Sequence, residues 1–140
     1  MMSFAEAKEL LLLHSYSHPN IDHPTLISGF LGSLRPYQGL NEANFQAVMN
    51  AVIALAPYFQ QEMLVDKEII AALWAICDLG RAWGIHPKGM LRRNHLISDQ
   101  DVLRLDQWIE CISWAVSTLL GGSDLDTALD LYRAYQRGEL

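Results

Sequence analysis

Residues 98–122 read SDQDVLRLDQWIECISWAVSTLLGG, and their pattern determines which kind of fold the chain can form. Ser98, followed by an acid at Asp101, is the aspartate variant of a capping box and predicts the start of a helix. The glycine pair after Leu120 predicts its end. Between these signals, apolar residues recur in alternating steps of three and four, which is the spacing of a buried seam in a helical bundle. The seam residues are Val102, Leu105, Ile109, Ile112, Val116 and Leu119.

The second half of this segment is apolar on nearly every side, because Trp108, Cys111 and Ala115 lie beside the seam. A helix that is apolar all round is surrounded by other elements in a globular protein. We therefore expect residues 99–120 to form a long central helix with the rest of the chain packed around it.

Further helices are predicted around this segment. Capping residues at Ser3, Asn41, Asp66 and Ser123 each precede apolar residues at helical spacing. Pro57 is expected to break or kink the helix that contains it, because proline lacks the amide hydrogen that an interior position needs. The expected helices cover residues 4–15, 24–34, 42–56, 67–83, 99–120 and 124–136. No alternating apolar and polar run is long enough for a strand, so the sequence predicts an all-α fold, a single irregular bundle of about six helices in one domain over residues 1–140.

The composition excludes some classes of function. Of the 140 residues, 51% are hydrophobic and only 19% are charged, which favours a large core, an apolar interface or both. The net charge of −6 disfavours nucleic-acid binding, because phosphate backbones repel an acidic surface. The longest stretch without formal charge, residues 43–61, carries several amides and a proline, so no membrane association is expected. The N-terminus lacks the features of a signal peptide, and we expect a cytoplasmic protein.

One short segment departs from the acidic character of the chain. Lys88, Arg92 and Arg93 fall close together between Arg81 and His95. The simpler interpretation is a solvated basic loop beside acidic helix starts. The alternative is a docking patch for an anionic ligand or an acidic partner.

Residues 14–24, HSYSHPNIDHP, concentrate more reactive side chains than any other stretch. His14, His18, Asp22 and His23 could converge from a loop, and zinc accepts that combination of ligands. The prolines after His18 and His23 argue against a helical metal site, because a residue before proline is pushed out of the helical conformation. No catalytic signature occurs, Cys77 and Cys111 both lie in apolar runs, and no catalytic residue or cofactor is predicted.

Tryptophans at positions 74, 83, 108 and 114 lie on apolar helices and are interpreted mainly as core residues. Trp83 and Trp114 are the candidate interface residues, since tryptophan is enriched at contact hot spots and Trp114 projects off the main seam. The sequence predicts a non-catalytic, intracellular protein-interaction module that binds a protein partner or associates with itself as a homodimer. The alternative is a helical bundle that binds a small molecule or a metal through the His14–His23 loop.

Overall fold

The long helix α7 (Asp99–Leu120) runs through the whole molecule and contacts most other elements. The computed structural model describes all residues from Met1 to Leu140. The remaining helices are α1 (Phe4–His14), α2 (Pro24–Ser28), α3 (Glu42–Ala54), α4 (Ala56–Gln61), α5 (Lys67–Gly80), α6 (Met90–Arg93), α8 (Leu125–Ala128) and α9 (Asp130–Gln136), with a π-helical turn η1 (Arg81–Ile85). The chain contains no strand, only an isolated β-bridge between Leu34 and Tyr37. The predicted all-α bundle with a central helix is confirmed.

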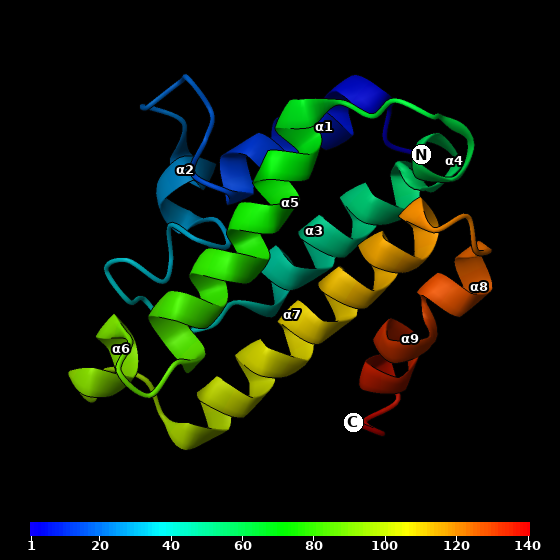
Figure 1. Ribbon diagram of the computed structural model, residues 1–140. Helices are drawn as coiled ribbons and strands as arrows, with labels where there is room; N and C mark the ends of the chain where they lie inside the picture. Colours follow the sequence, from blue (N-terminus) through cyan, green and yellow to red (C-terminus); the bar gives the residue numbers. More distant parts are fainter.

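The four long helices α1, α3, α5 and α7 form the body of the molecule, and the short helices lie at one end and along one side (Figure 1). α1 packs on α3 and α5, and α7 packs on α3, α4 and α5. α2 and α6 lie at one end, while α8 and α9 cover a side of α7 near the C-terminus. No helix combines the length and hydropathy that a membrane crossing requires.

Most of the predicted start signals act as expected. Ser3 and Glu6 form a complete capping box, and the side chains of Asn41, Asp66 and Ser98 each accept a hydrogen bond from a backbone amide in the first turn. The prediction for Ser123 is off by one residue. The N-cap is Asp124, whose carboxylate accepts from the amide of Thr127 at 2.8 Å.

The structure corrects several predicted boundaries. The helix expected over residues 24–34 ends at Ser28, because Gly29 turns extended and the chain continues as tight turns up to Leu34. The predicted helix 42–56 ends at Ala54, and Pro57 lies in the first turn of α4, where its missing amide costs no hydrogen bond. Helix 67–83 gives way to the π turn after Gly80.

Two further differences concern short helices. The predicted helix 124–136 is divided at Leu129 into α8 and α9. The short helix α6 was not expected, because it has no side-chain cap and its four residues are too few for a periodic pattern.

The aromatic part of the core lies where α3, α7 and α9 meet. Trp108 of α7 stacks on Phe45 of α3, with ring centroids 5.2 Å apart and planes 7° from parallel. The hydroxyl of Tyr135 accepts from Trp108 Nε1 at 2.8 Å and donates to the carboxylate of Glu42. These hydrogen bonds connect the last helix to both long helices beneath it.

Candidate functional site

Each histidine of residues 14–24 accepts a backbone hydrogen bond at its Nδ1 atom. His14 Nδ1 accepts from the Phe30 amide at 2.9 Å, His18 Nδ1 accepts from the Asn20 amide, and His23 Nδ1 accepts from the Thr25 amide as the N-cap of α2. A nitrogen that accepts a hydrogen bond has its lone pair occupied and does not at the same time coordinate a metal.

The side chains also do not come together as one group of metal ligands. The His18 and His23 rings lie 6.1 Å apart, and Asp22 is on the exposed loop between them. His14 is 3% exposed, and burial lowers its pKa from 6.5 to about 4, so the ring is neutral at physiological pH. No group of three or more histidine, cysteine or acidic side chains in the chain could hold a metal ion. The His14–His23 loop is therefore held together by hydrogen bonds that order the connection between α1 and α2.

The thiols of the two cysteines are not activated. Burial raises the pKa of Cys77 and of Cys111 to about 11 in each case. Both thiols therefore stay protonated near neutral pH, which is the unreactive form.

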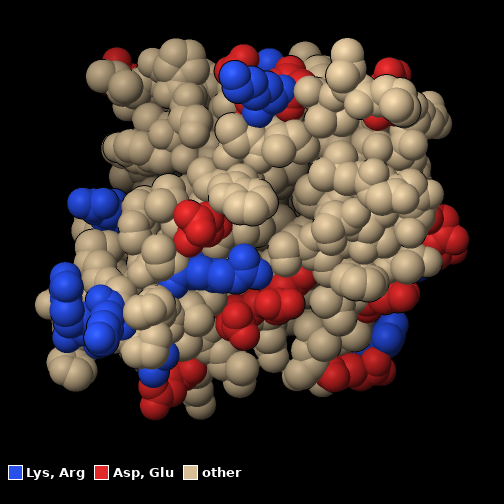
Figure 2. Space-filling model, in the orientation of Figure 1, with Lys and Arg blue, Asp and Glu red and all other residues tan.

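The basic residues expected to form an anionic-partner patch gather at the edge of the molecule occupied by α6 (Figure 2). Lys88 and Arg93 are exposed, whereas Arg92 is half-buried and donates from Nη1 to the carbonyl of Ile85 at 3.0 Å. None of the three forms an ion pair within the chain. The patch exists as a cluster of cations, and its role as a docking site stays a prediction.

The four tryptophans have different environments. Trp108 is buried, Trp83 is half-buried with the Arg35 guanidinium carbon 5.5 Å from its ring centroid, and Trp114 is 41% exposed. Trp114 Nε1 donates to the carbonyl of Thr127 at 3.0 Å, which holds its ring against α8. Trp74 is the most exposed, at 73%, so the interpretation of this tryptophan as a core residue is wrong.

Trp74 stands at the centre of an apolar surface on α5, which we call the α5 outer face. It consists of Val65, Lys67, Ile70, Ala71, Trp74, Ala75, Asp78 and Leu79. Six of these eight residues are hydrophobic, and the charged pair lies at opposite ends. Figure 2 shows tan surface over the middle of α5 and the C-terminal half of α7, with charged side chains toward the two ends of α5.

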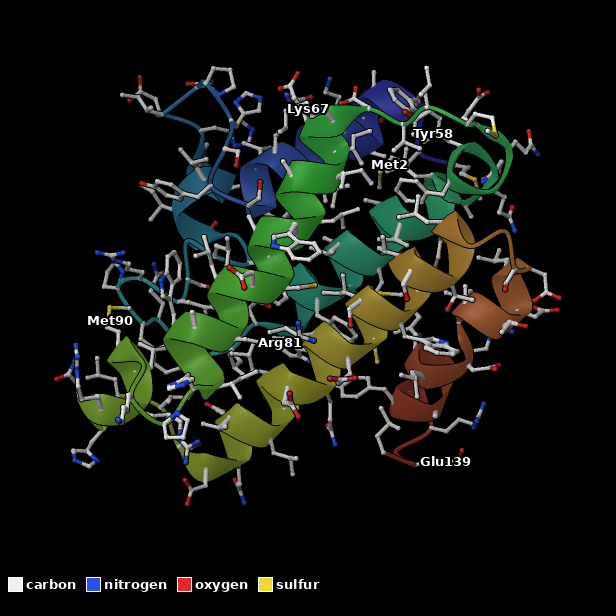
Figure 3. All side chains as sticks on the ribbon, in the orientation of Figure 1. Met2, Tyr58, Lys67, Arg81, Met90 and Glu139 are labelled. Carbon is white, nitrogen blue, oxygen red and sulfur yellow. The ribbon has the colours of Figure 1, made fainter.

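On one side of Trp74 the surface deepens into a groove between α5 and α7, with a volume of about 310 Å³. We call this the α5–α7 groove. Its apolar lining consists of Ile70, Leu73, Trp74, Cys77, Ile112, Val116 and Leu120. Leu73 and Ile112 are almost fully buried and form its floor. At one end Arg81 lies between the two helices (Figure 3), with Nη2 3.6 Å from Glu110 Oε1.

The groove exists because α5 and α7 are close at one end and diverge at the other (Figure 1). A Cβ on Gly80 would lie 2.8 Å from Ile109 Cδ1, and one on Gly84 would lie 2.5 Å from Leu105 Cδ2. Glycine at these positions permits the close approach, because any side chain would overlap with α7. Toward Lys67 and Leu120 the helices carry larger residues and separate, which leaves the groove open.

This surface was not predicted, although the sequence does contain a signal for it. Lys67, Ala71, Trp74 and Asp78 follow helical spacing on the side of α5 opposite the buried stripe. An aromatic residue that lies between charged residues along one side of a helix is expected to be exposed.

Comparison of the chain with protein-family models, with curated proteins and with solved structures finds no match.

Proposed function

We propose that this chain is a non-catalytic protein-interaction module that binds its partner on the α5 outer face and in the α5–α7 groove. The observation that carries the proposal is the position of Trp74, which is 73% exposed in the middle of a continuous apolar surface. Tryptophan contributes strongly to protein interfaces when a partner buries it. A contiguous exposed apolar surface is typical of an interaction site, because a partner that covers it removes apolar area from water and so stabilises the complex.

The state of the chemically versatile residues supports a binding role. The His14, His18 and His23 rings accept backbone hydrogen bonds, and burial raises the pKa of both thiols. Arg81 is engaged with Glu110 at the end of the groove. The polar residues around the groove thus border an apolar contact area.

The proposal is tested by affinity capture from the native host with tagged wild-type chain and two matched variants. Trp74→Glu places a charge at the centre of the α5 outer face, whereas Leu103→Glu changes an exposed leucine of α7 outside it; Leu103 is 60% exposed. We expect wild type and Leu103→Glu to retain the same protein, including untagged copies of the chain, and Trp74→Glu to lose it. Equal capture by all three chains would contradict the proposal.

A second candidate is the binding of a small apolar molecule in the α5–α7 groove. Its volume of about 310 Å³ is at the lower end of the range of ligand pockets, and its lining is mainly apolar. This differs from the small-molecule alternative based on the His14–His23 loop, which lies elsewhere in the molecule. Native mass spectrometry of the purified chain tests it, since a stoichiometric adduct that is lost in Val116→Phe would support groove occupancy.

A further inference from the structure

Lys67 and Asp78 lie at opposite ends of the α5 outer face, and neither forms an ion pair within the chain. Figure 3 places Lys67 at the start of α5, with Arg81 just beyond the other end. The neighbouring charges are already paired: Lys8 lies 3.4 Å from Glu68, and Arg81 lies 3.6 Å from Glu110. Lys67 and Asp78 are therefore the two charges of this face that remain available to a partner.

These residues belong to one straight line along the helix. Lys67, Ala71, Trp74 and Asp78 are separated by steps of four, three and four residues, and all four are exposed. Such steps keep side chains on one side of a helix, over a length of about three turns. The spacing of four, three and four residues reads the same from either end of the helix. When two copies of this helix lie antiparallel, each of the four residues therefore faces a residue of the same set.

We propose that the partner of the α5 outer face is a second copy of this chain, with the two α5 helices antiparallel about a two-fold axis between Ala71 and Trp74. This inference rests on the function proposed above and names the partner. In this arrangement Lys67 meets the partner's Asp78, and Trp74 lies over the partner's Ala71. The symmetry repeats each contact, as in every two-fold interface.

The charges at the ends of the α5 outer face and the sizes of its central side chains both favour a second copy of the chain as the partner. An antiparallel pair brings opposite charges together at both ends of the apolar line, whereas a parallel pair would bring like charges together. Alanine opposite tryptophan leaves room for the indole, so the helices can approach while the ring is buried. The proposal moves the centre of the dimer from Trp83 or Trp114, which the sequence suggested, to Trp74.

The interface is expected to be weak. A helix with the length of α5 spans about 21 Å, and two such helices bury less than the ~800 Å² per partner of a standard interface. We expect a dissociation constant on the order of micromolar, with the dimer in exchange with the monomer.

Charge reversal provides the test, measured by sedimentation velocity from micromolar to near-millimolar concentration. Lys67→Glu alone places acids opposite one another at both ends, and Asp78→Lys alone places bases opposite one another. We expect each variant alone to associate roughly tenfold or more weakly than wild type. An equimolar mixture of the two should recover wild-type association, because every contact between unlike variants joins opposite charges. The double variant should recover it as well.

Both substitutions are compatible with folding. A glutamate in the first turn of α5 and a lysine in its last turn agree with the helix dipole, and circular dichroism should match wild type. Loss of association can therefore be assigned to the interface.

The outcomes separate this inference from the proposed function. A wild-type mass that stays at 15.8 kDa at all concentrations, or a mixture that stays monomeric, overturns the second copy as partner. If a different protein is still captured through Trp74, the interaction function stands. If wild type and Trp74→Glu dimerise equally and Trp74→Glu captures the same proteins, both fail.

Discussion

His14 connects the first helix to the turns that follow α2, through a hydrogen bond that joins residues far apart in the chain. Its Nδ1 accepts from the buried amide of Phe30, and a Cβ on Gly29 would lie 3.2 Å from the same nitrogen. The sequence drew attention to this histidine for its possible chemistry. Its structural role could not be predicted, because helical periodicity says nothing about the course of a loop that returns to the helix from which it started.

The buried ring of His14 makes the stability of the fold dependent on pH. Burial lowers its pKa from 6.5 to about 4, so between these values the unfolded chain binds a proton that the folded chain does not. Stability is fully present above the unfolded pKa and is lost as the pH falls through 6.5 toward 4. At about pH 5 this loss amounts to roughly 2 kcal/mol.

His14→Asn removes the titration and keeps a hydrogen-bond acceptor near the Phe30 amide. We expect the variant to be less stable than wild type at neutral pH, since asparagine packs less well, and the difference to shrink as the pH falls toward 4. Urea denaturation at several pH values measures both free energies of unfolding. A constant difference between His14→Asn and wild type would contradict the assignment.

At the scale of the helices, the sequence predicted α7 almost completely, because its seam, cap and terminal glycines all agree. α5 was predicted less well. Ile69, Leu73 and Ile76 are buried at helical spacing. The apolar residues beside them in the sequence gave no contrast that would show which side of the helix faces water. The break at Leu55 agrees with the interruption expected at Pro57. The breaks at Gly80 and Leu129 were missed, since they depend on tertiary packing more than on local turn signals.

Substitution of Gly80 by alanine tests whether the close packing of α5 on α7 fixes the geometry of the groove. Gly80→Ala adds a methyl group that would lie 2.8 Å from Ile109 Cδ1, and overpacking of this kind costs about 1–3 kcal/mol. Alanine also gains about 1 kcal/mol of helix propensity over glycine, so the two effects oppose each other. We expect Gly80→Ala to be neutral or destabilising in the wild-type background.

Ile109→Val removes the Cδ1 atom and relieves the overlap. In that background Gly80→Ala should become stabilising by about 0.5–1 kcal/mol, because only the propensity gain remains. A double-mutant cycle from chemical denaturation gives the coupling free energy between the two positions, expected at about 1–2 kcal/mol. Additive effects would show that α5 and α7 separate easily at this point.

For the whole molecule, the composition indicated more apolar surface than a small bundle can cover, and several large apolar side chains are exposed, with Trp74 among them. The position of that surface did not follow from composition. It depends on which sides of α5 and α7 are covered, and α8 and α9 pack against Trp114 and Trp108 on the far side of α7 from the groove. The sequence therefore indicated uncovered apolar surface but not its position around Trp74, which is more exposed than Trp114. The role of any of these tryptophans in an interface stays a prediction.

A single domain over residues 1–140 remains a prediction at this scale, and its cooperativity can be measured. The core cluster extends without interruption from Ala7 in α1 to Tyr132 in α9, so both ends of the chain should unfold together.

Tyr135→Phe leaves the buried Trp108 Nε1 without its acceptor and should lower the free energy of unfolding by about 1–3 kcal/mol. His14→Asn acts at the other end. Each variant should shift the transitions seen by circular dichroism and by tryptophan fluorescence to the same extent. Measurements at low micromolar concentration limit the contribution of self-association to the midpoint. Separate transitions for the two probes would show that the C-terminal helices unfold independently of the rest.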